Sequence, residues 1–200
     1  MSSRVALAAA RAGGAVQLVG KTGDDPTADG VVLDLARGAV GHVALLRESA
    51  RATPLEPVAA DEDEAPADPD AVAVDPEPRL ASLTDGPAID AGDVDLGLRY
   101  LTEFGVVVVA EPARADVITV VSDAARWAEA RMVLVIPAGS PVPDDLPADV
   151  IVFEAPVDDP DGAFADLVGS FAAALDDGVE PAEAFQASID SDGWTGVTDD

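Results

Sequence analysis

Cysteine is absent from the 200 residues, which excludes disulfides, thiolate catalysis and metal sites built on cysteine. There is one histidine, His42, so a Ser-His-Asp triad would have to be built around it. It begins a predicted strand in GHVALLR, where we expect a solvent-facing edge position. No apolar run approaches the roughly 20 residues of a membrane-spanning helix. These absences favour a cytoplasmic protein with no membrane partner.

Basic residues are also scarce, and Lys21 is the only lysine. Eleven basic residues against 39 acidic ones give a formal net charge of -28. Acids spread over the whole chain are typical of a protein from a high-salt cytoplasm, where salt screens the self-repulsion. An acidic partner-binding protein is the other interpretation. Nucleic acid is excluded as a partner because no basic patch could release its counterions.

Aromatic residues make up only 4% of the chain, whereas 48% of the residues are hydrophobic. The core must therefore consist mainly of valine, alanine and leucine. Such a composition suits thin helices packed on valine-rich strands, so a sizeable α/β core is expected.

Hydrophobic periodicity predicts alternating helices and strands. Asp25 can cap a helix that has Pro26 at its first position and ends at Gly38. The expected strands are 15–20, 41–47, 105–110, 131–137 and 149–155. The expected helices are 3–12, with Ser3 as cap, 26–38, 92–103, 114–130, 164–175 and 180–189. The stretch DVITVV alone would fit a strand, but its valines and the later alanines share one helix face. The sequence predicts a three-layer αβα domain with a mostly parallel sheet.

Residues 54–78 differ from the rest, with six prolines, nine acids and no periodicity. Such a segment cannot bury enough apolar surface to offset its ordering entropy, so we expect a disordered acidic insert. The predicted organisation is then 1–53 and 79–193 as two parts of one domain, separated by this insert. An acidic tail, 194–200, completes the chain.

Two stretches resemble the ribokinase/PfkB family of carbohydrate kinases. RVALAAARAGGAVQLVGKTGDDPTADGVVLDLARGAVGHVALLRESARATP is similar to the N-terminal region of that family, and DDPDGAFADLVGSFAAALDDGVEPAEAF is similar to its C-terminal signature D-T-x-G-A-G-D-A-F. The resemblance implies a ribokinase-like fold that lacks the lid and the first strand, because Met1 falls where that strand should lie. It also implies phosphoryl transfer from ATP, with Mg, to a sugar hydroxyl.

The resemblance places candidate substrate-binding residues at the first strand-to-helix turn. They are Arg4, at the position of the family's substrate-contacting Asn, and Lys21, Gly23, Asp24 and Asp25. As an alternative, Lys21 would only neutralise Asp24 or Asp25.

The candidate nucleotide- and anion-binding residues are Asp159, Gly162 and Ala163. Alignment through Ala163-Phe164 puts Gly162 at the position of the catalytic aspartate, and a shift by one residue returns Asp161 as the base. Acidic residues and Pro160 then stand where glycine amides should hold the developing phosphate charge. We expect no metal site here: a solvated helix-capping cluster is the favoured interpretation of these acids.

Three functions remain open. The first is a divergent sugar-kinase homologue with lost or impaired phosphotransfer, in which binding of a sugar or nucleotide would remain. The second is a functional small ATP-dependent carbohydrate kinase with Asp161 as its base. The third is an interaction or regulatory module that acts through the acidic insert. A homodimer is compatible with all three.

Overall fold

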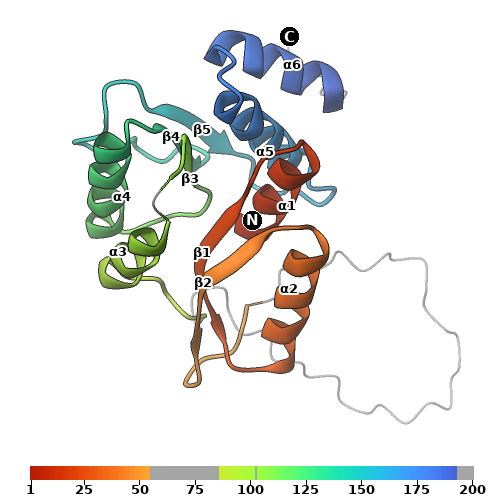
Figure 1. Cartoon of the computed structure of the whole chain (residues 1–200), viewed down its shortest axis with the longest axis vertical. Helices are drawn as coiled ribbons and strands as arrows, with labels where there is room; N and C mark the ends of the chain where they lie inside the picture. Colours follow the sequence, from red (N-terminus) through yellow and green to blue (C-terminus); the bar gives the residue numbers. More distant parts are fainter. Residues whose placement is uncertain (55–85, 102, 193–200) are drawn as a thin grey trace, which may run out of the picture.

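The computed structural model describes residues 1–54, 86–101 and 103–192. Helices and strands alternate from α1 to β4, after which β5 follows β4 directly and α6 follows α5 (Figure 1). The strands are β1 (Gln17–Gly23), β2 (Gly41–Glu48), β3 (Val106–Val109), β4 (Arg131–Pro137) and β5 (Ile151–Ala155). The helices are α1 (Ser2–Arg11), α2 (Pro26–Arg37), α3 (Ala91–Tyr100), α4 (Ala115–Ala128), α5 (Ala163–Asp176) and α6 (Pro181–Asp192).

The strands form two parallel sheets and not the single sheet that the sequence predicted. One sheet pairs β1 with β2, and the other has the order β3-β4-β5. The first strand is also longer than predicted: it continues beyond Gly20 to Gly23, because this stretch pairs with Leu45–Glu48 of β2. The pairing partner lies outside the local sequence, so the apolar run alone placed the end of β1 too early.

Helices cover both faces of the strands, which confirms the predicted three-layer α/β class. On the β3-β4-β5 sheet, α1 and α5 cover one face and α3 and α4 the other. Alternation along β3 divides its residues accordingly: Val106 and Val108 pack towards α5, and Val107 and Val109 towards α4. On the β1-β2 sheet, α1 and α2 share a cluster with β1, and α3 lies against the strands so closely that a Cβ on Gly97 would stand 2.7 Å from Val19.

The local sequence predicted most of the helices correctly. Helix α2 begins with Pro26 after the cap Asp25, as predicted. The contested stretch DVITVV is helical within α4, as predicted from its apolar face. Helix α1 starts after Met1 and has no side-chain cap of its own, so the expected cap Ser3 is wrong. The acidic insert and the tail predicted at 54–78 and 194–200 lie almost wholly outside the described residues. No helix in the described ranges has the length and apolar character needed to cross a membrane.

Helix α1 joins the two sheets. One side of it packs on α2 and β1, where Ala6 belongs to a cluster with Leu35. The other side crosses α5, where a Cβ added to Gly169 would stand 2.5 Å from Ala8 Cβ and 2.7 Å from the Ala9 nitrogen and the Val5 oxygen. Only a residue without a side chain allows the two helix backbones to approach this closely.

Gly169→Ala should therefore weaken the fold, because two of the three nearest atoms are backbone and cannot move without separating α1 from α5. We expect a loss of about 1–3 kcal/mol in the free energy of unfolding, the usual cost of overpacking a core. Urea titration in molar KCl measures it.

Gly30→Ala is the matched control. Gly30 lies on the exposed face of α2 with nothing within 4 Å of its added Cβ, so the same change should stabilise the protein by up to about 1 kcal/mol. Equal effects of the two substitutions would contradict the close crossing.

Candidate functional site

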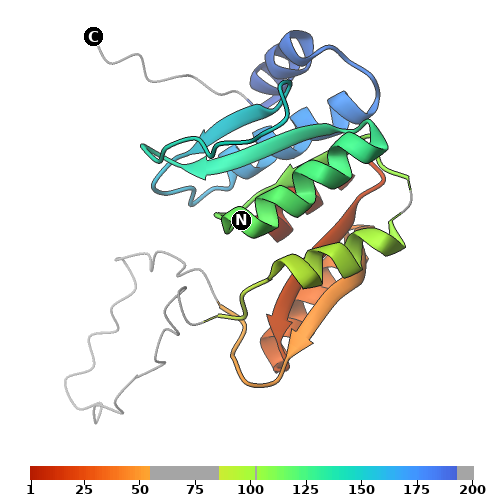
Figure 2. The ribbon, with the colours of Figure 1, turned by 90° about the vertical axis from the view of Figure 1, so that its left-hand side faces the viewer.

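In parallel sheets the carboxyl ends of the strands carry the ligand sites. The strands of both sheets run towards the left-hand side of Figure 2, so the segments that follow them gather there. Most of the sequence-predicted residues lie in two places, and Arg4 lies on α1. One follows β1 and the other follows β5.

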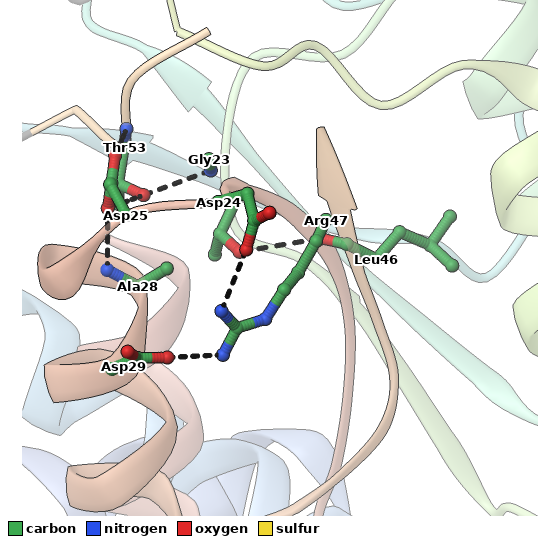
Figure 3. A network of polar contacts seen from close by, with 9 residues as sticks. Gly23, Asp24, Asp25, Ala28, Asp29, Leu46, Arg47 and Thr53 are labelled. Atoms are coloured by element: carbon green, nitrogen blue, oxygen red, sulfur yellow. Dashed lines mark hydrogen bonds and ion pairs between the residues drawn. The ribbon is translucent and has the colours of Figure 1, made fainter. Parts of the chain in front are cut away.

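At the end of β1, the Asp25 carboxylate accepts three hydrogen bonds (Figure 3). Oδ1 receives the Ala28 N–H at 2.8 Å and the Thr53 hydroxyl at 2.9 Å, and Oδ2 receives the Thr53 N–H at 2.7 Å. The bond from the Thr53 N–H, followed by that from Ala28, lowers the pKa of Asp25 below its ordinary value. Asp25 thus caps α2 and fastens the chain segment after β2 to the turn.

Gly23 lets that segment come close. Its N–H donates to Thr53 Oγ1 at 2.9 Å, and a Cβ at Gly23 would stand 2.6 Å from the Arg51 oxygen and 2.7 Å from the Thr53 nitrogen. Any side chain at this position would displace the 51–53 backbone.

Asp24 points to a different partner. Arg47 on β2 lies 3.3 Å from Asp24 Oδ1 and 2.7 Å from Asp29 Oδ1 (Figure 3). The hydrogen bonds to Asp29 and Asp24 raise the pKa of Arg47. All three side chains are substantially exposed, so this arginine holds the β2 end and the first turn of α2 together at the surface.

Lys21 is paired with Asp93 of α3, and not with Asp24 or Asp25 as the alternative had it. Its Nζ lies 2.5 Å from Asp93 Oδ2, and the side chains are only 16% and 18% exposed. The hydrogen bond to Asp93 raises the pKa of Lys21, with Asp90 and Glu48 adding smaller attractions and burial opposing them. The only lysine therefore ties β1 to the start of α3.

The second group surrounds the start of α5. Asp159 Oδ1 accepts the Phe164 N–H at 3.0 Å, and Oδ2 accepts the Ala165 N–H at 3.2 Å. The Asp159 backbone oxygen accepts the Arg4 guanidinium at 2.9 Å and the Gly162 N–H at 3.2 Å. Two of the free amides in the first turn of α5, those of Phe164 and Ala165, which could bind an anion, thus already hold the chain's own carboxylate.

The remaining predicted residues fit around this turn. Gly162 is buried with φ +75°, in the left-handed region, and precedes the helix at its N-cap position. Ala163 is the first helical residue, and Asp161 is exposed. The structure thus brings Arg4, Asp159 and Gly162 into contact, while Lys21 is engaged with α3.

Sequence reasoning missed Thr53, Arg47, Asp93 and Glu111. Glu111, after β3, accepts the Ser2 N–H at 3.0 Å and the Ser2 hydroxyl at 2.7 Å, and so caps α1 from a distant segment. The spacing of Asp90 and Asp93 could have revealed their capping box, which the structure contains. The other partners come from distant parts of the chain and carry no local signal.

An apolar cavity of about 310 Å³ adjoins the start of α5, between β5, α5 and α6. Its aromatic wall contains Phe153, Phe164 and Phe185, and Ile189 of α6 also lines it. No cluster of potential metal ligands occurs in the parts of the chain that the structure describes. The cavity therefore offers mainly apolar contacts, and Glu154 is the charged residue among those that line it.

No protein-family model matches this chain, and no curated protein matches it in sequence. Among solved structures, that of Sa239 aligns with 99% of this chain and 82% of its own chain, with a TM-score of 0.63 and 11% identity. At this identity the likeness shows a shared fold alone.

Two further solved structures are weaker matches. An uncharacterized sugar kinase from Pyrococcus horikoshii aligns with a TM-score of 0.43 and 16% identity over 67% of this chain and 41% of its own. Fructokinase from Xylella fastidiosa with bound ATP aligns with a TM-score of 0.42 and 17% identity over 94% of this chain and 57% of its own. This chain thus spans less than two thirds of either kinase, and such scores carry no argument about activity.

Asp25→Asn tests the hydrogen bonds that the Asp25 carboxylate accepts at the end of β1. Asparagine keeps an oxygen for Ala28 but turns an NH₂ group towards the Thr53 N–H, so we expect lower stability at pH 7. The lowered pKa means that the Asp25 carboxylate stabilises the fold above its ordinary pKa of 3.8 and loses this contribution as the pH falls through the folded-state value.

The stability difference between wild type and Asp25→Asn should therefore shrink below about pH 4. Urea titrations across that pH range measure it. Asp24→Asn removes the same charge from an exposed ion pair and should have the smaller effect at pH 7. A stability difference between wild type and Asp25→Asn that is constant with pH would contradict a stabilising role of the ionised Asp25 carboxylate.

Proposed function

We propose that this chain is a divergent homologue of the ribokinase-type carbohydrate kinases that has lost phosphotransfer. The proposal combines the sequence resemblance of residues 4–54 and 158–185 with one observation, the Asp159 carboxylate on the first amides of α5. Binding of a sugar or a nucleoside is the function that such a scaffold retains.

Phosphoryl transfer needs donors aimed at the charge that develops on the phosphate. Here the Phe164 and Ala165 amides hold Asp159, so an incoming phosphate meets a carboxylate in place of free N–H groups. Two unit charges about 4 Å apart repel by about 4 kcal/mol at an effective dielectric constant of about 20. That is roughly a thousandfold in affinity or rate, which supports lost transfer over a merely slow enzyme.

Arg4 supports the same turn. Its guanidinium donates to the backbone oxygen of Asp159 and so holds the turn that presents the carboxylate to α5. The Arg4 side chain is thus used to position Asp159, whose carboxylate occupies the Phe164 and Ala165 amides.

We expect no ATP-dependent phosphorylation of a sugar panel in molar KCl, with ADP release no faster than without sugar. The coupled ADP assay measures this, and sugar-dependent turnover would contradict the proposal. If turnover occurs, Asp161→Asn decides whether the small-kinase alternative is correct, because loss of the proposed base must then abolish it.

Isothermal titration adds a test that needs no turnover. The phosphates of ATP cannot accept hydrogen bonds from amides that already donate to Asp159. ATP with Mg should therefore bind no more tightly than adenosine. A functional phosphate site would give the opposite order.

A second candidate function, an interaction module, is favoured by the base of the acidic segment. Arg51 donates to the Gly86 oxygen at 3.4 Å, and a Cβ at Gly86 would lie 3.0–3.4 Å from Pro54. Pro54 and Gly86, the described residues on either side of 55–85, therefore lie side by side. Asp25 holds Thr53, which precedes Pro54.

Replacing residues 56–78 by a short Gly-Ser linker should leave the melting temperature unchanged, since Pro54 and Gly86 already lie side by side. Affinity capture with the full chain and with the shortened chain compares their partners. Partners lost only with the segment would support the interaction module, and identical partners would contradict it.

A further inference from the structure

The outer face of the layer formed by α3 and α4 carries exposed aromatic side chains. The two helices pack together, and Figure 2 shows them side by side on the near side of the molecule. Trp127 of α4 is 80% exposed and Tyr100 of α3 is 70% exposed, and they are the two largest of the exposed hydrophobic side chains in the described residues. Aromatic residues make up only 4% of the chain, so two of them exposed on one layer set this layer apart.

Smaller apolar residues extend this aromatic surface. On α4, Val120 and Ala124 precede Trp127 at helical spacing and are only partly buried. On α3, Leu96 is 47% exposed and lies one turn before Tyr100. We call these five residues the α3–α4 face. Its composition is that of the centre of a protein interface, where tyrosine and tryptophan are enriched.

The carboxylates on the same two helices are all paired. Helices α3 and α4 contain four of them, and the pairs are Asp93 with Lys21 at 2.5 Å, Asp95 with Arg99 at 2.5 Å, Asp116 with Arg114 at 2.8 Å and Asp123 with Arg126 at 2.9 Å. By contrast, residues 163–192, which include α5 and α6, contain acidic residues and no basic ones. The α3–α4 layer is therefore close to neutral within a chain whose formal net charge is -28.

This distribution of charge decides which partner the α3–α4 face suits. Two copies of a strongly acidic chain repel one another wherever their carboxylates are brought together without cations, because like charges opposite one another suppress association. On the α3–α4 face that repulsion is small, since each carboxylate has its own cation, and apolar contact is available. A basic protein would instead be attracted to the side formed by α5 and α6. The face therefore suits a second copy of this chain.

We propose that the α3–α4 face joins two copies of this chain in a symmetric dimer. A two-fold axis brings the same patch of each copy together. An aromatic side chain buries about 150–250 Å², so Tyr100 and Trp127 of both copies, which are 70% and 80% exposed, would together bury about 450–750 Å². A stable interface buries about 1,200 Å² or more, and these four side chains supply a large share of that area. This inference does not rest on the proposed loss of phosphotransfer.

Sedimentation equilibrium of the full chain in molar KCl tests the dimer. We expect a monomer–dimer equilibrium whose dissociation constant rises about tenfold or more in Trp127→Ser, because a buried tryptophan carries much of the affinity of an interface. Val43→Ser is the matched control: Val43 on β2 is 76% exposed and lies outside the α3–α4 face, so the dissociation constant should not change. A chain that stays monomeric, or an equal effect of the two substitutions, would overturn the proposal.

A pair of charge reversals tests the role of the paired carboxylates. Arg99→Glu takes the cation from Asp95 on α3, and Arg37→Glu takes it from Asp34 on α2. The two arginines are similarly exposed, at 72% and 69%, and both substitutions change the net charge equally. We expect Arg99→Glu to weaken the dimer severalfold more than Arg37→Glu, and the difference to grow as KCl is lowered. Equal weakening would show that net charge alone governs association and would overturn the assigned face.

The fluorescence of Trp127 reports the contact without a change in the face itself. Trp194→Phe leaves Trp127 as the only tryptophan. As the protein concentration rises through the dissociation constant, we expect its emission to shift to shorter wavelength and its quenching by acrylamide to fall severalfold. Dimerisation with unchanged emission and quenching would place the interface elsewhere, and protection of Trp127 only after addition of cell extract would identify a different protein as the occupant. Either result would overturn the proposal.

Discussion

The crossing of α1 and α5 is the contact on which the other parts depend. The two helices are more than 150 residues apart in sequence, and their backbones meet at Gly169, where only hydrogen fits between them. Helix α1 also packs on α2 and β1, so this crossing holds the β1-β2 sheet against the β3-β4-β5 sheet, together with α3, which packs on both sheets. It also sets the polar chemistry, because it brings Arg4 of α1 to the turn before α5.

The carboxyl edge of the sheets is arranged around the chain's own acids. The positive end of α5 is satisfied by Asp159, and that of α1 by Glu111. Both acids are supplied by segments that follow strands, at the place where α/β folds otherwise bind ligands. Each such pairing stabilises a helix start and removes a binding site for an anion.

The end of β1 shows the same preference for internal partners. Asp25 holds Thr53, Arg47 joins Asp24 and Asp29, and Lys21 joins Asp93. Lys21 and Arg47 thus connect different secondary-structure elements. The hydrogen bonds to Thr53 also hold the neighbouring Pro54 in place, and Pro54 lies beside Gly86.

Local sequence determined the elements whose signals lie within a few residues. Asp25 and Pro26 marked the start of α2, and the run RMVLVIP marked β4 from Arg131 to Pro137 without error. The α/β class followed from the alternation of such elements. The helix-capping interpretation of the acids before α5 was also correct for Asp159, because a cap acts on amides close in sequence.

Only the tertiary structure decided where long-range partners lie. The division into two sheets, the extension of β1 to Gly23 and the pairing of Lys21 with Asp93 all depend on elements remote in sequence. No periodicity or motif encodes which of many carboxylates stands beside a given cation, since an ion pair depends on distance in space. The sequence by itself therefore determined the helices, the strands and their class, and packing decided which charges met.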